Sequence, residues 1–300
     1  MKLFKVTALL LAVLLMSLLF VGGCGEPEQA EEYTVVIAGK GWAENMTLAY
    51  MAALLIEANT DLKVDTTKVN MGPTEMLHPA LVEGQIDLYP EYTGTAWMVV
   101  LKQEVIQDRV EIFEKSRDAY QEQFGITCLD PLGFQNTFAI AMPREKAEEL
   151  GITTLSELAA FPDLTFVGDS TTFTRPDVYL GLAETYGLNM NQVIVDTAFF
   201  YEALAQGQGD VTTCFSTDGR LKEYGFVVLE DDKSFFPPYD AMFVVRTELL
   251  EQYPEIAEAL APLLGTIDGE TMTELNYKVE VEQQEPEDVA REFLKARGLI

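Results

Sequence analysis

The sequence predicts a protein of the α/β class, folded into two lobes with a cleft between them. Two runs of alternating strands and helices indicate this, one from Tyr33 to Phe124 and one that begins near Thr137. The chain has 300 residues, the length of about two domains. Ligands of open α/β sheets bind beyond the carboxyl ends of the strands. We therefore expect a ligand site where the two lobes face each other.

The first run alternates strands and helices in a regular order. Tyr33 to Ala38 is predicted to form a strand, and the turn Gly39-Lys40-Gly41 leads into a helix from Ala43 to Ala58. Strands that alternate with helices usually pair in parallel, so we expect parallel strands in this lobe. The pattern further predicts a strand at Leu62–Val69, a helix at Thr74–Val82 capped by Thr74, a strand from Ile86, and helices at Ala96–Val100 and Val110–Phe124.

The second run repeats this alternation, and the C-terminal part from about Tyr239 adds one strand and then mostly helices. Strands are predicted at Phe138–Met142, Leu164–Val167, Val193–Asp196 and Asp210–Cys214. Helices are predicted at Lys146–Leu150, Leu155–Ala160, Pro176–Tyr186 and Phe199–Gln206.

The charge balance limits the kinds of partner. The formal net charge is −29, from 20 basic and 49 acidic residues. So acidic a chain has little with which to neutralise phosphates, which argues against a nucleic-acid partner.

The N-terminus has the features of a targeting segment in residues 1–23. Two lysines precede an almost wholly apolar stretch from Val6 to Val21, and two glycines lead into Cys24. This pattern is typical of a bacterial lipoprotein signal, in which Cys24 becomes the lipidated first residue and residues 24–32 form a tether. The alternative is an uncleaved membrane anchor, since about 16–18 apolar residues nearly span a bilayer. In both cases the body of the protein is expected on the outer face of the cytoplasmic membrane.

Two further cysteines follow Cys24, and the sequence leaves their state open. An oxidising compartment would allow Cys128 and Cys214 to form a disulfide, whereas two buried reduced cysteines are the alternative.

Catalysis has little support in the sequence. The motifs G-x-S-x-G, H-E-x-x-H, C-x-x-C and the P-loop are all absent. The single histidine, His78, lies on a predicted helix, where packing is the simpler role. We therefore expect neither an enzyme nor a cofactor or metal site.

The stretch from Asp87 to Thr95 is the most distinctive candidate for a binding loop. Proline cannot donate to a strand ladder, so the strand is expected to stop at Pro90, and Gly94 permits a tight turn. Tyr92 and Thr95 would then lie on a loop at a strand end, where binding residues often occur. An ordinary turn with a surface tyrosine is the alternative.

Two cations occupy unusual positions for so acidic a chain. Lys40 precedes the helix from Ala43, and Arg175 precedes Pro176, a predicted first helical residue. A helix N-terminus favours anions over cations. Each residue could therefore help to hold a bound anion such as a carboxylate, although chance surface charges are the alternative.

Aromatic residues stand at similar junctions. Phe138 begins a strand, Phe215 follows one, and Tyr239 follows two prolines. Core packing is the usual role of such residues. Gathered around a cleft, they could instead enclose a quaternary ammonium through cation–π contacts.

Five motifs follow one another along the chain: Asp87–Thr95, Gly133–Phe138, Ser216–Arg220, Leu229–Lys233 and Phe235–Tyr239. Through these motifs the sequence, from about Thr34 to Leu299, resembles the substrate-binding proteins of glycine betaine/carnitine/choline ABC transporters.

This resemblance implies a two-lobed periplasmic-binding-protein fold of type II, in which the chain crosses between the lobes twice. One lobe would comprise residues 33–136 and 240–300, and the other would comprise residues 137–239. The lobes would close about a hinge on the ligand.

The family's site residues can be carried over to this sequence. The resemblance implies an aromatic box for the ammonium at Tyr92, Phe138, Phe215 and Tyr239, where relatives commonly have four tyrosines. It implies contacts to a ligand carboxylate from Lys40, Thr95 and Arg175. Trp42 could form a further wall of the pocket, or pack in the core.

The implied function is ligand delivery without chemistry. A monomeric, lipid-anchored receptor would bind glycine betaine, carnitine, proline betaine or choline and deliver it to an ABC permease. One alternative is another trimethylammonium betaine, such as ergothioneine, or another organic cation. Two other classes are a ligand sensor for a membrane receptor and an extracytoplasmic enzyme of this fold.

Overall fold

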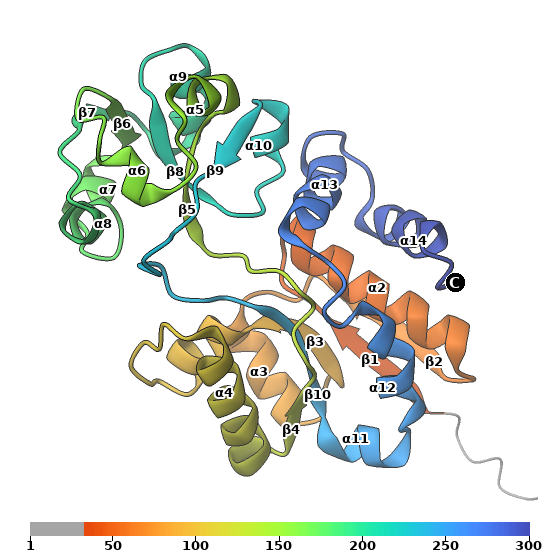
Figure 1. Cartoon of the computed structure of the whole chain (residues 1–300). Coiled ribbons are helices and arrows are strands. Elements are labelled where there is room, and N and C mark those ends of the chain that lie inside the picture. Colours follow the sequence, from red (N-terminus) through yellow and green to blue (C-terminus); the bar gives the residue numbers. More distant parts are fainter. Residues whose placement is uncertain (1–32) are drawn as a thin grey trace, which may run out of the picture. The chain divides into compact units, whose positions relative to one another are not determined.

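The computed structural model describes residues 33–300 as two five-stranded mixed sheets with helices packed around each (Figure 1). The predicted signal peptide, the tether and the lipidation site Cys24 lie outside the described residues. Within the described part, no helix is both long enough and apolar enough to cross a membrane.

The first sheet has the strand order β2-β1-β3-β10-β4. The strands β1, β2 and β3 are parallel, whereas β10 runs antiparallel to both of its neighbours, β3 and β4. The sheet is therefore mixed and not wholly parallel as predicted, because its fourth strand comes from the C-terminal part of the chain. The strands are β1 (Thr34–Ala38), β2 (Lys63–Lys68), β3 (Leu88–Tyr92), β4 (Ile126–Cys128) and β10 (Ala241–Arg246).

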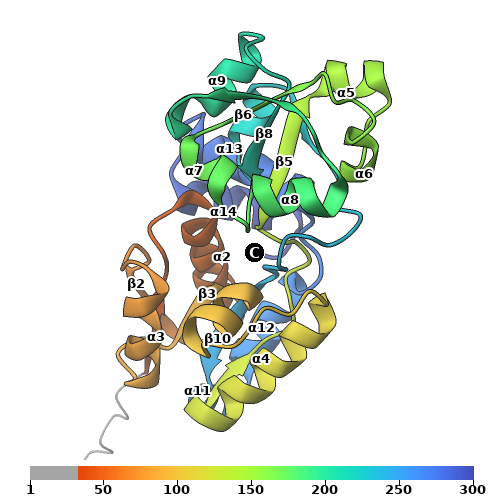
Figure 2. The ribbon, with the colours of Figure 1, turned by 90° about the vertical axis from the view of Figure 1, so that its left-hand side faces the viewer.

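Two groups of helices surround this sheet. Helix α2 packs against the C-terminal helices α12, α13 and α14, and Figure 2 shows α4 on the other side of the strands. The helices that precede β5 in the chain are α2 (Ala43–Asn59), α3 (Thr74–Val82), the π-helix η1 (Thr95–Val100) and α4 (Arg109–Phe124). The helices that follow β10 are α11 (Thr247–Gln252), α12 (Glu255–Leu260), η3 (Ala261–Leu263), α13 (Gly269–Glu280) and α14 (Pro286–Ala296).

The second sheet has the strand order β7-β6-β8-β5-β9, and β5 is its antiparallel member. Its strands are β5 (Phe138–Pro143), β6 (Thr165–Gly168), β7 (Asn191–Ile194), β8 (Val211–Phe215) and β9 (Phe226–Val228). Its helices are α5 (Arg144–Leu150), α6 (Leu155–Leu158), α7 (Ser170–Thr174), α8 (Tyr179–Tyr186), η2 (Thr197–Phe199), α9 (Phe200–Ala205) and α10 (Arg220–Glu223).

Two segments connect the sheets, one from β4 to β5 and one from β9 to β10. They run side by side, since Gln135 and Asp240 form an antiparallel bridge and the Asn136 amide donates to the Tyr239 carbonyl. The predicted lobe boundaries at residues 136 and 240 fall on these segments and stay a prediction.

The prediction that the strand stops at Pro90 is wrong, because β3 continues to Tyr92. The amide of Thr93 donates to Asp240 next to β10, so in an alternating strand the nitrogen of Pro90 faces the opposite side. There β1 pairs with β3 only at Leu88, so the missing donor costs no ladder bond. The Pro90 carbonyl accepts a hydrogen bond from the Asn45 side chain at 2.8 Å.

Two further predictions about helix starts are also wrong. Pro73 is the N-cap of α3, and the Thr74 hydroxyl donates instead to Glu91 at 2.9 Å. Helix α8 begins at Tyr179, and Arg175 is the C-cap of the preceding short helix α7. Arg175 therefore does not stand at a helix N-terminus, and the dipole argument made for it from the sequence does not hold.

Both cysteines of the described chain are reduced and buried. Cys128 lies on β4 of the first sheet and Cys214 on β8 of the second. Burial raises the pKa of the Cys128 thiol to about 12, so both residues act as small hydrophobic side chains.

Candidate functional site

A pocket of about 470 Å³ lies between residues of the first sheet's helices and loops and residues of the second sheet. It is lined by Lys40, Trp42, Glu44, Tyr92, Thr95, Asn136, Phe215, Thr217, Asp218, Arg220, Tyr239, Asn276 and Glu280.

Five residues predicted as ligand contacts lie together in this lining. Lys40 precedes α2, Tyr92 ends β3, and Thr95 begins η1. Phe215 ends β8 of the second sheet, and Tyr239 stands on the segment that returns to the first. The carboxyl ends of strands thus supply two of the aromatic rings, as the α/β pattern predicted.

Phe138 stands one step behind the pocket lining. It is the antiparallel partner of Phe215, and the two rings stack with centroids 5.0 Å apart and an interplanar angle of 27°. Phe215 is 50% exposed, an unusual state for a large apolar side chain. Phe138 therefore supports the ring that the pocket presents.

Arg175 is not among the residues that line the pocket. It is exposed, and its guanidinium forms an ion pair with Asp177. Asp177 acts electrostatically on one residue of the lining, since burial and then the Asp177 carboxylate raise the pKa of Tyr239.

Lys40 is buried and already has a carboxylate partner. It forms an ion pair with Glu91, which is fully buried and also accepts from Thr74 and from the Tyr92 amide. The Lys40 Nζ lies 4.9 Å from the ring centroid of Tyr92 and 5.3 Å from that of Trp42. The charge of Lys40 is thus balanced by Glu91, and its ammonium lies against two aromatic rings of the site.

Glu44 of the pocket accepts hydrogen bonds from four different residues, and the sequence prediction missed it. Its Oε1 accepts from the Tyr92 hydroxyl at 2.6 Å and the Asn136 amide at 2.9 Å. Its Oε2 accepts from the Thr217 hydroxyl at 2.6 Å and the Asn276 amide at 3.1 Å. Burial and then the Glu44 carboxylate raise the pKa of Tyr92 well above its usual range. The sequence offered only one signal, an acid in the first turn of a helix, which is common.

The loop before α10 supplies a second charged group that was missed. Asp218 accepts from the guanidinium of Arg220, and that guanidinium also lies 4.6 Å from the ring centroid of Tyr201. Glu280 of α13 accepts from the Gly219 amide at 3.1 Å. The motif Ser216–Arg220 was noted as distinctive, but its side-chain partners depend on tertiary contacts.

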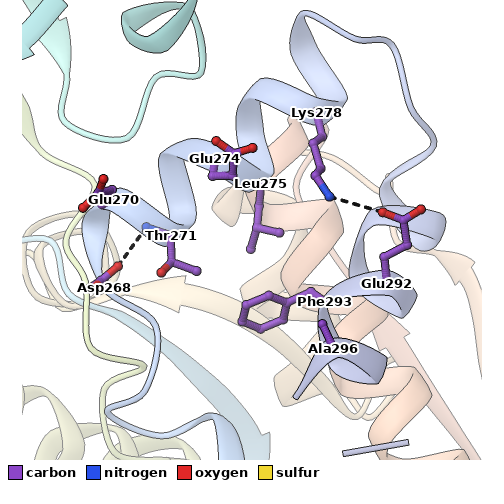
Figure 3. A pocket seen from close by; sticks show the side chains of 9 residues that line it. All are labelled: Asp268, Glu270, Thr271, Glu274, Leu275, Lys278, Glu292, Phe293 and Ala296. Carbon is purple, nitrogen blue, oxygen red and sulfur yellow. Dashed lines mark hydrogen bonds and ion pairs between the residues drawn. The ribbon is translucent and has the colours of Figure 1, made fainter. Parts of the chain in front are cut away.

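A second hollow of about 500 Å³ lies along α13 and α14, and Figure 3 shows the side chains that line it. Lys278 pairs with Glu292 at 3.2 Å, and Asp268 accepts from the Thr271 amide at the start of α13. Phe293 is its one aromatic lining residue. This hollow thus lies on the surface of neighbouring helices and has a single aromatic ring, whereas the first pocket has four aromatic lining residues.

The first pocket is suited to binding and orienting a small cation. Aromatic faces from both halves of the protein surround it, and three of its five charged lining residues are acids. Residues 33–300 contain no cluster of three or more histidine, cysteine or carboxylate ligands arranged for a metal ion. Two α/β lobes around such a pocket define the class of two-lobed solute-binding proteins.

Residues 33–296 match the model of the OpuAC family, the substrate binding domain of ABC-type glycine betaine transport systems, and the chain belongs to this family. It is therefore an extracytoplasmic substrate-binding component of an ABC importer, with a small-molecule ligand and a permease partner. The family and the two-lobed fold predicted from the sequence are confirmed.

Three similar proteins illustrate the family. A crystal structure of a glycine betaine/carnitine/choline ABC transporter protein is 33% identical, covers 88% of this chain and 99% of its own, and gives a TM-score of 0.83. A glycine-betaine-binding protein of Pseudomonas aeruginosa is 35% identical over 94% of this chain and 92% of its own. The ergothioneine transport permease/ergothioneine binding protein EgtU of Helicobacter pylori is 36% identical over 90% of this chain. The chain spans only 48% of the length of that last relative.

Proposed function

We propose that this protein binds a quaternary-ammonium compatible solute, namely glycine betaine, carnitine, proline betaine or choline, and delivers it to its permease. The observation that carries this proposal is the convergence of Tyr92, Phe215 and Tyr239 on one pocket lined by three carboxylates. A quaternary ammonium cannot donate ordinary hydrogen bonds, so ring faces are its natural partners. Each well-placed ring contributes about 0.5–2 kcal/mol.

The aromatic box for the ammonium consists of Tyr92, Phe215 and Tyr239, with Phe138 stacked behind Phe215. Phenylalanine keeps the ring face but lacks the hydroxyl of the tyrosine common in relatives. Trp42, which lines the pocket and stacks on Tyr92, adds a further face.

The carboxylate of a betaine is held by Thr95, Lys40 and Arg175 in this proposal. Thr95 and Lys40 line the pocket. Arg175 reaches the ligand by leaving Asp177, which costs little because an exposed ion pair contributes only about 0–1 kcal/mol.

Titration calorimetry with the four solutes tests the function. Binding of at least one is expected, and absence of measurable heat with all four would contradict the proposal. Arg175→Ala should weaken glycine betaine by about tenfold and leave choline, which has no carboxylate, nearly unchanged. Arg117→Ala, which breaks the exposed pair with Asp118 on α4, is the matched control.

Ergothioneine is the second candidate ligand. It is also a trimethylammonium betaine, and the relative that carries it in its name is 36% identical to this chain. The two phenylalanines at positions 138 and 215 leave fewer hydroxyls around the pocket and so favour a ligand with a larger apolar part. Competition between ergothioneine and glycine betaine for one site would rank the two.

The protein acts by reversible binding as a monomer, held at the membrane through a lipid on Cys24. The pocket chemistry supports binding without catalysis, because its carboxylates are taken up by hydrogen bonds and an ion pair. Recovery of chemically unchanged ligand after long incubation with the protein tests whether binding occurs without catalysis. Metabolic labelling with a fatty acid, lost in Cys24→Ser, tests the anchor.

A further inference from the structure

Glu44 is a buried carboxylate with four hydrogen bonds and no cationic partner. Its residue is 1% exposed. The two cations that share its pocket are both paired elsewhere, Lys40 with Glu91 and Arg220 with Asp218. No lysine or arginine of residues 33–300 forms an ion pair with Glu44.

A buried charge is costly unless it is both hydrogen-bonded and balanced by an opposite charge. The four donors around Glu44 meet the first requirement, but all four are neutral groups. The second requirement is met by no residue of the described chain. The missing positive charge can come from the pocket, because Glu44 lines it beside the rings of Tyr92 and Phe215.

We infer that Glu44 provides the counter-charge of the bound cation and thereby determines the preference of the site for cationic over neutral ligands. This inference rests on the proposed function. The aromatic rings alone would accept any group of the right shape, with a modest preference for a cation. A full negative charge beside them, shielded from water, adds a long-range attraction that a neutral ligand of the same shape does not feel.

The four bonds to Glu44 also link the two halves of the protein. The carboxylate belongs to α2, whereas Thr217 follows β8 of the second sheet and Asn136 lies on a connecting segment. The Glu44 carboxylate therefore has all four of its donors only when the two halves of the protein meet. This is the arrangement in which a ligand would be enclosed between them. Asn276 of α13 reinforces this meeting point by also donating to the Thr217 carbonyl at 2.7 Å.

A pair of ligands with the same shape isolates the charge. Choline and its carbon analogue 3,3-dimethylbutan-1-ol differ in the quaternary nitrogen, and their affinities are measured for the full-length protein and for Glu44→Gln. The ratio of the two affinities should fall by about tenfold or more in Glu44→Gln. An unchanged ratio would overturn the inference, even if both ligands bind more weakly.

Thr217→Val is the matched control. It removes one bond to Glu44 at 2.6 Å and leaves the charge in place. We expect weaker binding of both ligands with the ratio preserved. If Thr217→Val lowers the ratio as much as Glu44→Gln does, Glu44 acts only through geometry and the inference is wrong.

Glu44→Asp keeps the inference testable if Glu44→Gln does not fold, because it retains the charge and should retain most of the ratio. If Glu44→Asp lowers the ratio of choline affinity to 3,3-dimethylbutan-1-ol affinity as far as Glu44→Gln does, while the melting temperature without ligand is unchanged, the inference is again contradicted. Failure of the native protein to bind any of the four solutes would instead overturn the proposed function itself, and the inference with it.

Discussion

Lys40 combines two roles that are usually separate in a binding site. It is 2% exposed, forms an ion pair with the fully buried Glu91, and places its ammonium against the rings of Tyr92 and Trp42. A lysine in this position supplies positive charge next to the site but also shares the ring faces that a ligand cation would use. Glu91 offsets the cost of burying the Lys40 ammonium, because its carboxylate balances the positive charge.

Removal of Lys40 should therefore affect stability more than any other change at the pocket. Lys40→Met leaves the Glu91 carboxylate buried and without a cation, and we expect a loss of about 3–5 kcal/mol in the free energy of unfolding. The double variant Lys40→Met/Glu91→Gln should recover most of that loss, since neither charge remains. Urea unfolding measures both values. Equal losses in the single and double variants would show that the ion pair is not the cause.

Glu280 gives the pocket a dependence on pH. Partial burial first, and then the Asp218 carboxylate, raise the pKa of Glu280 to about 7, and part of this residue is exposed to water. Glu44 acts in the same direction, while Arg220 and the Gly219 amide oppose the shift. Glu280 is thus largely neutral below that pH and an anion above it.

A cationic ligand should gain affinity as Glu280 ionises. We expect choline to bind about two- to threefold more tightly at about pH 8 than at about pH 6, since water screens an exposed carboxylate. Calorimetric titrations of the native protein and Glu280→Gln measure this, and the variant should be insensitive to pH. His78, the single histidine, is outside the pocket lining, so an effect that persists in Glu280→Gln would point to another group.

The pocket residues that could be predicted from the sequence are those whose type is unusual at their position in the chain. Tyr92 and Phe215 stood out as aromatics at strand ends, Tyr239 as an aromatic after two prolines, and Lys40 as a rare cation. The structure brings all four to one pocket. Glu44 has no such signal, because one acid among 49 acidic residues becomes distinctive only through its partners. Those partners lie up to 232 positions away in the chain. Whether each of these residues contacts ligand stays a prediction.

At the scale of elements, β3 shows why local rules can fail in a sheet. The rule that proline ends a strand assumes that its nitrogen faces a partner strand. In β3 the nitrogen of Pro90 faces a side where β1 no longer pairs with β3. The side chain of Asn45, on α2, donates a hydrogen bond to the Pro90 carbonyl. Neither the position of β1 nor the direction of Asn45 can be derived from the residues around Pro90.

The turn after β3 allows a sharper test. A Cβ on Gly94 would lie 2.7 Å from ring atoms of Tyr239 and 2.8 Å from the Pro238 carbonyl oxygen. Gly94→Ala should displace the Tyr239 ring and the backbone at Pro238, lower the melting temperature and weaken glycine betaine binding by about tenfold. Gly269→Ala is the control, because its Cβ would meet no atom within 4 Å. Normal affinity in Gly94→Ala would remove Tyr239 from the aromatic box.

At the scale of the whole molecule, the order of strands and helices predicted the α/β class, but not the pairing within each sheet. Alternating elements indicate parallel strands, and β1, β2 and β3 follow that rule. Strand β10 pairs antiparallel with β3 although about 150 residues separate them, because the chain returns from the second sheet beside its outgoing segment. Local periodicity carries no information on such a return. The resemblance to a known family supplied it, through motifs on both connecting segments.

The loop before α10 contacts α13 at Gly219. A single methyl group added at Gly219 should separate the two halves of the protein there. A Cβ on Gly219 would lie 2.5 Å from the backbone nitrogen of Tyr277, a contact that side-chain rotation cannot relieve. The backbone of Gly219 has φ −59°, so alanine is compatible with its local conformation and folding of each sheet should be unaffected.

Gly219→Ala should therefore hold the loop away from α13 and weaken every ligand alike. Ligand affinity should fall by about tenfold or more for choline and glycine betaine together, with the ratio between them unchanged. Small-angle X-ray scattering should show that saturating ligand compacts the native protein more than the variant. The control Gly269→Ala lies on α13, the helix that Gly219 contacts, and should behave as the native protein. If Gly219→Ala binds and compacts normally, the contact between this loop and α13 is not part of ligand enclosure. The bonds to Glu44 would then be the contacts that join the halves around a bound cation.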